Sequence, residues 1–118
     1  VKAMIVAHER DVAAIHLNNP EMKNVIKRVL ISPKEGWQGY VMRTFELGEG
    51  GYTPKHSHPW PHINYITQGK GILHLEGQDY ELEAGSFAYV PEGKIHQFRN
   101  QGTAPFMLIC IVPEEGDV

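Results

Sequence analysis

The sequence contains a single cysteine, Cys110, among its 118 residues. One thiol cannot form a disulfide within the chain, so burial of apolar side chains must hold the fold, and a reducing compartment is favoured. No Ser- or Gly-rich linker, low-complexity segment or internal repeat divides the chain. Because a chain of this length seldom forms two cores, we expect one domain over residues 1–118, located in the cytoplasm.

Long apolar runs and concentrated basic charge are also missing. The longest apolar run, residues 106–112, is far shorter than the roughly 20 residues needed to cross a bilayer. The apolar start of the chain stops at His8, so we expect no signal peptide. The 11 Lys and Arg residues are scattered, 14 Asp and Glu outnumber them, and the net charge is -3. The sequence therefore predicts neither a membrane partner nor a nucleic-acid partner.

Glycine and proline punctuate the chain at short intervals and leave short segments with strand composition between them. These segments span residues 25–31, 40–47, 63–67, 71–76, 86–90, 95–99 and 106–112. Residues 75–82 are predicted to form two antiparallel strands joined at Gly77 and Gln78, because glycine tolerates the positive φ of a tight hairpin. Residues 10–17 are the one candidate helix. This pattern is typical of an all-β antiparallel barrel that covers its own edges.

Seven histidines are present, and three of them cluster. His56, His58 and His62 lie in the segment GGYTPKHSHPWPHINYITQG, residues 50–69. On an extended strand His56 and His58 point to the same face, and the Pro-Trp-Pro turn before His62 can bring its ring back toward them. His96 follows a Pro-Glu-Gly turn 34 residues later. Two ligands close in sequence, with others delivered by tertiary structure, are typical of a metal site.

The histidine segments resemble the two motifs of the cupins, a family of small β-barrels. The first motif, G-x5-H-x-H-x3,4-E-x6-G, matches at Gly50, His56, His58 and Gly69, with His62 where the family usually has glutamate. The second, G-x5-P-x-G-x2-H-x3-N, matches throughout, at Gly85, Pro91, Gly93, His96 and Asn100. The motifs at residues 50–69 and 85–100 imply one cupin barrel, a jelly roll also described as a double-stranded β-helix.

Within the family, the chain is most similar to small single-domain cupins whose first motif reads HSHPW-x-H. This resemblance implies one divalent transition-metal ion per chain, held by four ligands, His56, His58, His62 and His96. Imidazole suits several ions, so Mn, Fe, Ni, Cu and Zn all stay open. Four neutral imidazoles leave the charge of the ion uncompensated, which favours an anionic small-molecule ligand. Because neutral imidazole is the binding form, we expect occupancy to fall as the pH drops through about 6.

The strands beside the ligands supply four candidate pocket residues. Arg43 shares one strand face with the apolar residues Val41, Phe45 and Leu47. It therefore either holds a ligand carboxylate from the inner face or pairs with a buried acid. Phe98 shares the face of His96. Leu108 and Cys110 share one face of the last segment, and the register leaves open whether that face or the opposite one lines the pocket.

Arg43 and Cys110 are also the candidate catalytic residues, although a buried cysteine is otherwise a small inert hydrophobe. The histidines outside the motifs, His8, His16 and His74, are expected not to bind the metal.

Three functions are compatible with the cupin resemblance, because this barrel hosts many chemistries. The first is a metal-dependent enzyme with oxygenase-type chemistry on a small chelating organic acid or enol. The second is a non-catalytic module that binds or senses a metal or small ligand. The third is a sugar isomerase or epimerase, which would need more hydroxyl-binding residues than the predicted pocket contains.

The cupin resemblance also predicts a homodimer. Cupins of this size commonly pair through amino-terminal strands, and residues 3–7 have a suitable composition. Pairing of this kind would cover edge strands that a small barrel leaves open.

Overall fold

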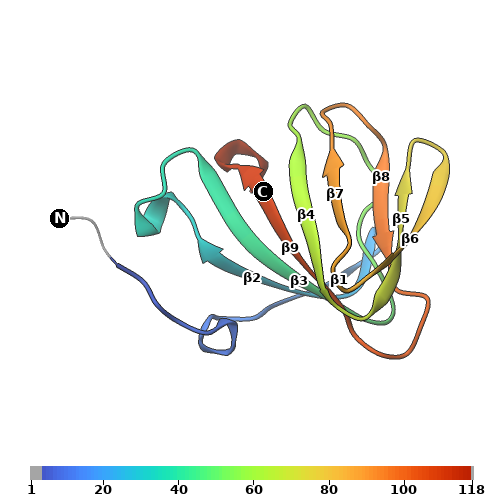
Figure 1. Ribbon diagram of the computed structural model, residues 1–118, viewed down its shortest axis with the longest axis horizontal. Helices are drawn as coiled ribbons and strands as arrows, with labels where there is room; N and C mark the ends of the chain where they lie inside the picture. The colour runs from blue at the N-terminus through green and yellow to red at the C-terminus, as the bar shows by residue number, and fades with distance from the viewer. Residues whose placement is uncertain (1–3, 118) are drawn as a thin grey trace.

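The computed structural model describes residues 4–117, which fold into an antiparallel barrel of nine strands (Figure 1). The strands are β1 (Ile15–Asn19), β2 (Met22–Ile31), β3 (Tyr40–Tyr52), β4 (His62–Gln68), β5 (Lys70–Leu75), β6 (Gln78–Glu83), β7 (Phe87–Val90), β8 (His96–Arg99) and β9 (Phe106–Pro113). Three short 3₁₀ turns accompany them, η1 (Glu9–Asp11), η2 (Pro33–Glu35) and η3 (Glu114–Gly116). The all-β antiparallel barrel predicted from the sequence is confirmed.

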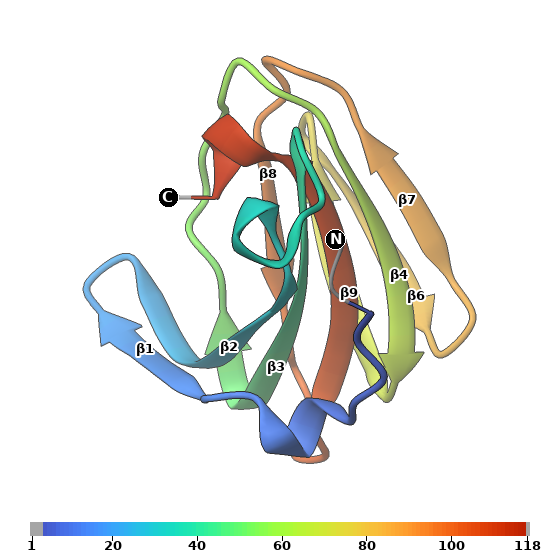
Figure 2. The ribbon, with the colours of Figure 1, turned by 90° about the vertical axis from the view of Figure 1, so that its left-hand side faces the viewer.

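Strand β3 joins the two halves of the barrel. The strand order is β6-β5-β8-β3-β9-β4-β7, and β2 also pairs with β3 while β1 pairs with β2. Along most of its length β3 lies between β2 and β9, and it reaches β8 through the single pair Tyr52 and Arg99. Figure 2 shows β1 to β3 on one side of β9, with β4 and β7 on the other.

The face of β9 that the sequence left open is decided by burial. Phe106, Leu108, Cys110 and Val112 are buried, and the residues between them are half-buried. Leu108 and Cys110 therefore face the interior, as one of the two predicted alternatives required. The buried apolar side chains that form the core are Val25, Val41, Leu47, Ile66, Leu73, Val90, Phe98, Phe106, Leu108, Cys110 and Val112.

The hairpin between β5 and β6 turns one residue earlier than predicted. Leu75 pairs with Gln78, so the turn residues are Glu76 and Gly77 rather than Gly77 and Gln78. Both have positive φ, 47° and 84°. This is the type I′ geometry that matches the twist of the flanking strands, and glycine is needed at only one of the two positions.

The predicted helix over residues 10–17 is wrong. The 3₁₀ turn η1 ends at Asp11, and β1 begins at Ile15 and pairs with β2. Leu17 packs against the core from this strand, so tertiary pairing outweighs the weak local helix pattern. No helix in residues 4–117 has the length and apolarity needed to cross a membrane.

The segment expected to pair with a second subunit, residues 3–7, lies at the amino-terminal end. Residue 3 is outside the described residues. Residues 4–7 form no strand with the rest of the chain, and the side chains of Met4 and Val6 are almost fully exposed. In Figure 1 this end of the chain projects away from the barrel.

Asn100, the last residue of the second motif, fastens loops at one end of the barrel. Its buried amide nitrogen lies 2.8–3.1 Å from the carbonyl oxygens of Leu47, Gly48 and Ala104 and donates to them. Its amide oxygen accepts a hydrogen bond from the backbone N–H of Gly102. Asparagine is therefore required here by the fold, because its amide both donates and accepts.

Candidate metal centre

Backbone hydrogen bonds join the two histidine motifs. His56 and His96 exchange N–H to O=C bonds of 3.1 and 2.9 Å across an isolated β-bridge. The backbone N–H of Gly93 donates to the carbonyl of His58 over 2.8 Å, and the φ of 76° at Gly93 belongs to the left-handed region that favours glycine. The expectation of an extended strand through His56 and His58 is wrong, because this segment is a loop held by these bonds.

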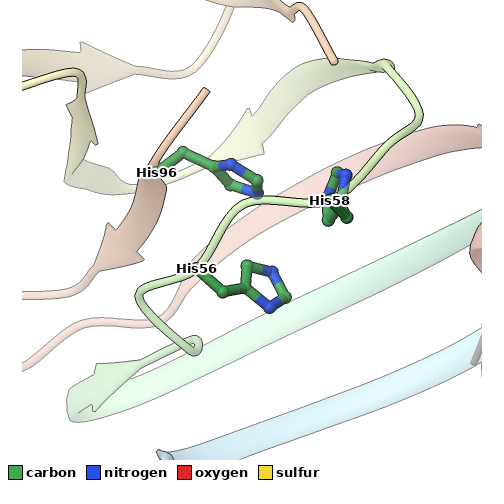
Figure 3. Close-up of side chains that lie close together, drawn as sticks. All are labelled: His56, His58 and His96. Atoms are coloured by element: carbon green, nitrogen blue, oxygen red, sulfur yellow. The ribbon is translucent and has the colours of Figure 1, made fainter. Parts of the chain in front are cut away.

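Three histidines lie close enough together to bind one metal ion. The candidate ligand nitrogens of His56, His58 and His96 are all within 4.8 Å of one another (Figure 3). The fourth predicted ligand, His62, begins β4, and its Nε2 lies 3.1 Å from the Nε2 of His96. All four motif histidines are therefore brought together, His58 from the loop and His96 from the start of β8.

Backbone carbonyls set the tautomers of His58 and His96. The Nδ1 of His58 is 2.8 Å from the carbonyl oxygen of Trp60, and the Nδ1 of His96 is 2.9 Å from that of Lys94. A carbonyl oxygen can only accept, so Nδ1 carries the proton in both rings. Each Nε2 then keeps a free lone pair, which is the arrangement found in metal-ligating histidines.

Asn64 is the side-chain partner of His62. Its buried amide nitrogen lies 2.7 Å from His62 Nδ1, and its buried amide oxygen has no hydrogen-bond partner among the described residues. An amide can face the ring with either atom. With the nitrogen facing, Nδ1 accepts and Nε2–H donates to His96. With the oxygen facing, Nδ1–H donates and Nε2 keeps its lone pair, so Asn64 suits both the metal-free and the metal-bound tautomer.

Burial keeps two of these histidines neutral. It lowers the pKa of His62 to about 3, helped by the nearby charges of His96, His58 and Arg43. It also lowers the pKa of His96 to about 4, and burial together with His58 lowers the pKa of His56. In the metal-free chain His62 and His96 therefore stay neutral well below pH 6.5, and the fall of metal occupancy near pH 6 stays a prediction.

The histidines open onto a cavity of about 160 Å³. All four predicted pocket residues line it, namely Arg43, Phe98, Leu108 and Cys110. Its other lining residues are Leu17, Met22, Val25, Lys27, Phe45, Thr53, Pro54, Trp60, Asn64 and Gly116, beside the four motif histidines. No aspartate or glutamate is among these lining residues, so the side-chain charge that they bring is positive.

Arg43 lines the cavity and also contacts a half-buried acid, Asp117, so its role as a ligand-binding residue stays a prediction. It is buried, it lines the cavity, and its guanidinium lies 5.0 Å from the ring centroid of Phe45. Its Nη2 donates to Cys110 Sγ over 3.0 Å, and its Nη1 lies 3.5 Å from Asp117 Oδ1. Burial raises the pKa of the Cys110 thiol, which keeps it protonated at neutral pH, as an acceptor for Arg43.

Several residues of the site were not predicted from the sequence, among them Lys27, Trp60, Asn64 and Asp117. Trp60 stacks on His58 at 4.8 Å between ring centroids and 9° between planes, and Lys27 Nζ lies 2.9 Å from Asp117 Oδ1. A signal for Lys27 was available, because it shares one strand face with the apolar residues Val25 and Val29. The three histidines outside the motifs belong to no metal cluster in residues 4–117, and His74 pairs with Asp79 instead.

Comparisons with known proteins identify the family and the fold. The family model described as "Cupin domain" matches residues 43–112. The polyketide cyclase RemF from Streptomyces resistomycificus superposes with a TM-score of 0.88 at 29% identity, over 95% of this chain and 80% of that one. A predicted oxalate decarboxylase from Thermotoga maritima superposes with a TM-score of 0.85 at 21% identity, over 92% of this chain and 98% of that one.

Among curated proteins, the tetracenomycin polyketide synthase protein TcmJ of Streptomyces glaucescens is 22% identical over 99 residues. That match covers 83% of this chain and 64% of TcmJ. Two shorter matches, to uncharacterised proteins of Aquifex aeolicus and Methanocaldococcus jannaschii, cover 40% and 38% of those proteins. The chain thus spans less than two thirds of the length of each of these curated relatives.

Proposed function

The chain belongs to the cupin family, and from this premise we propose that it is a metal-dependent enzyme that acts on a small chelating organic acid or enol. His56, His58, His62 and His96 would hold one divalent transition-metal ion. The observation that carries the proposal is the histidine cluster at the cavity wall, with Nδ1 of both His58 and His96 held by backbone carbonyls. When bound, such an ion supplies Lewis-acid polarisation and, if redox-active, electron transfer.

The position of His62 supports its role as a fourth ligand. Two nitrogens bound to one ion at about 2.1 Å lie about 3.0 Å apart at a right angle and about 3.4 Å apart at the tetrahedral angle. The 3.1 Å between the Nε2 atoms of His62 and His96 fits this spacing. The Nε2 of His96 directs a lone pair at His62, and with the amide oxygen of Asn64 turned to His62 Nδ1 the Nε2 of His62 would do the same, so one cation between them would be bound by both nitrogens.

The remaining cavity residues would bind and orient the ligand. Arg43 and Lys27 supply positive charge, which suits a carboxylate or enolate. Phe45, Phe98 and Leu108 supply an apolar wall that excludes water from the ligand body. Because no carboxylate lines the cavity in the described chain, a ligand that enters already ionised or enolised fits best.

Two reaction classes follow from different observations. Oxygenase-type chemistry is our first choice, because four neutral ligands leave the charge of the ion available to an anionic substrate. A ring closure without dioxygen is the second, favoured by the 29% identity to the polyketide cyclase RemF over 95% of this chain. The largely apolar wall supports neither a sugar isomerase nor an epimerase.

The two reaction classes differ in whether they consume dioxygen. Metal-free protein is reloaded separately with Mn²⁺, Fe²⁺, Ni²⁺, Cu²⁺ or Zn²⁺ and given a β-diketone, an α-hydroxyketone or a 2-hydroxybenzoate. We expect dioxygen uptake, measured with an electrode, with at least one redox-active ion and none with Zn²⁺. Product formation without dioxygen uptake would favour the cyclase class. Binding without turnover for every ion would leave the non-catalytic binding or sensing module.

We further propose a homodimer that buries the outer face of β4 and β7. Ile63 and Tyr65 on β4 pair with Tyr89 and Phe87 on β7. The exposed fractions of these four residues range from 49% to 78%. Contiguous exposed apolar residues of this kind are typical of interfaces. The exposed amino-terminal residues Met4 and Val6 would find apolar surface on the second copy.

The dimer is tested by its mass in solution. We expect light scattering to give about twice 13.3 kDa for the protein, and the mass of one chain after Phe87→Lys combined with Tyr89→Lys, because buried unpaired charge opposes association. Tyr80→Lys, at an exposed aromatic residue of β6, serves as the control and should leave the dimer intact. A monomeric unaltered protein would contradict the proposal.

We also propose that residues 1–118 form one cupin domain in the cytoplasm. The family match over residues 43–112 supports the first statement. The single cysteine, buried and unpaired, supports a reducing compartment.

A further inference from the structure

The last turn of the described chain is anchored beside the histidine cluster. Gly116, in η3, is buried, and a Cβ atom on it would collide with the indole of Trp60 and with Val112. Trp60 in turn stacks on His58. The absence of a side chain at Gly116 therefore lets η3 pack against Trp60 at the edge of the cavity, and this packing positions the next residue, Asp117.

Asp117 meets the two cations of the cavity with one carboxylate oxygen. Its Oδ1 lies 2.9 Å from Lys27 Nζ and 3.5 Å from Arg43 Nη1. The two cations come from neighbouring strands, β2 and β3, and both line the cavity. Lys27 and Arg43 thus already form a carboxylate-binding pair, and the carboxylate that they bind belongs to the chain itself.

Arg43 is incompletely satisfied by this arrangement. Its contact with Asp117 is long and uses one nitrogen, its Nη2 donates to the thiol of Cys110, and its buried Nε has no hydrogen-bond partner within residues 4–117. Sulfur is a weak acceptor, and a guanidinium binds most strongly to a carboxylate that takes two of its N–H groups. A carboxylate that accepts hydrogen bonds from two N–H groups of Arg43 would therefore bind more tightly than the carboxylate of Asp117 does.

The size and walls of the cavity limit what else such a ligand carries. Its volume of about 160 Å³ is close to that of a dry engineered cavity of about 150 Å³ that holds benzene. Phe45, Phe98 and Leu108 line it with apolar surface. The cavity therefore suits an organic acid whose apolar body is about the size of one six-membered ring.

We propose that Lys27 and Arg43 form a carboxylate subsite, that Asp117 occupies this subsite in the ligand-free chain, and that the carboxylate of a ring-sized organic acid displaces it. The proposal deepens the proposed function by naming the ligand class, and its link to catalysis rests on that function. The subsite itself consists of residues outside the histidine cluster. Displacement of Asp117 would break the contacts of its carboxylate with Lys27 and Arg43, so ligand binding and the position of the Asp117 side chain are coupled.

The test is a calorimetric titration of metal-free protein with benzoate, in a chelator, so that it does not depend on metal binding. Asp117→Asn removes the competing charge and keeps the shape, and we expect benzoate to bind about tenfold more tightly to this variant. Lys27→Gln is expected to weaken binding about tenfold, and Arg43→Met at least as much. Glu115→Gln, at an exposed acid of the same turn, is the matched control and should change nothing.

Benzamide, the neutral analogue of benzoate, separates charge competition from simple opening of the cavity. We expect Asp117→Asn to leave benzamide binding unchanged. Three results would overturn the proposal. In the first, Asp117→Asn binds both benzamide and benzoate more tightly than the unaltered protein does, by the same factor. In the others, Asp117→Asn binds benzoate no more tightly than the unaltered protein, or neither protein binds benzoate. If Arg43→Met does not fold, the titration of Lys27→Gln with benzoate still tests whether the subsite binds a carboxylate. Absence of metal from the histidine cluster would refute the proposed function and leave this titration valid.

Discussion

Replacing His56 and His58 together by alanine is expected to abolish stoichiometric metal binding. The variant keeps His62 and His96 but loses both ligands of the loop. Four-ligand zinc sites in small domains bind with about 10–16 kcal/mol, so losing half of the ligands costs several kcal/mol. That corresponds to at least about a thousandfold loss of affinity. Elemental analysis of untagged protein, produced with a mixed metal supply, measures the content directly.

The matched control for the metal analysis is His16→Ala combined with His74→Ala. It removes the same number of imidazoles from outside the cluster, one on β1 and one paired with Asp79. This control should keep the metal content of the unaltered protein. Metal-free unaltered protein, or equal metal content in the two double variants, would show that the histidine cluster is not a metal site.

The metal-free protein is expected to lose much of its stability between pH 6.5 and 4.5. In the unfolded chain His62 and His96 titrate near 6.5, whereas in the folded chain burial lowers their pKa values to about 3 and about 4. Below pH 6.5 the unfolded state therefore takes up protons that the folded state does not. Stability present above pH 6.5 is lost as the pH falls toward the folded values, by about 4 kcal/mol for two histidines. Small domains have about 5–15 kcal/mol in total.

Urea unfolding in a chelator at pH 6.5 and pH 4.5 measures this loss. His62→Leu removes one of the two titrating groups, so the free energy of unfolding of this variant should fall about half as much. His74→Ala should reproduce the loss of the unaltered protein, because His74 lies outside the cluster. Equal unfolding free energies at the two pH values would contradict the lowered pKa values of the buried pair.

Neutral histidines in the folded state also explain how the cluster could accept a metal in mildly acidic solution. An exposed histidine must lose a proton before it binds, which costs affinity below pH 6.5. His62 and His96 avoid this cost, because they are already neutral. The burial that makes the metal-free protein unstable in acid therefore also keeps His62 and His96 in the neutral form that binds a metal.

The carboxylate subsite and the metal cluster would act on the same ligand from two walls of one cavity. The histidines contribute neutral nitrogen donors, and Lys27 and Arg43 contribute fixed positive charge. A chelating acid placed between them is held at two points, which restricts its orientation. Asp117 would keep the cations paired whenever no such ligand is present.

The strands, the inward face of Arg43 and the histidine cluster could be predicted from the sequence, because each depends on residues close together in the chain. Glycine and proline mark the ends of the strands, and alternation along residues 40–47 correctly turned Arg43 inward. The two motifs identified the four histidines that the structure brings together. Each of these inferences depends on the period of two in a strand or on short-range turn chemistry.

Tertiary structure alone decided the features that depend on which strands meet. Pairing with β2 made residues 15–19 a strand, although the candidate helix over residues 10–17 extends into them. The register of β9 between β3 and β4 turned Leu108 and Cys110 inward. The contact of Asp117 with Lys27 and Arg43 joins residues 90 and 74 positions apart in the chain. Contacts over such separations leave no period in the sequence, because they arise only when the barrel closes.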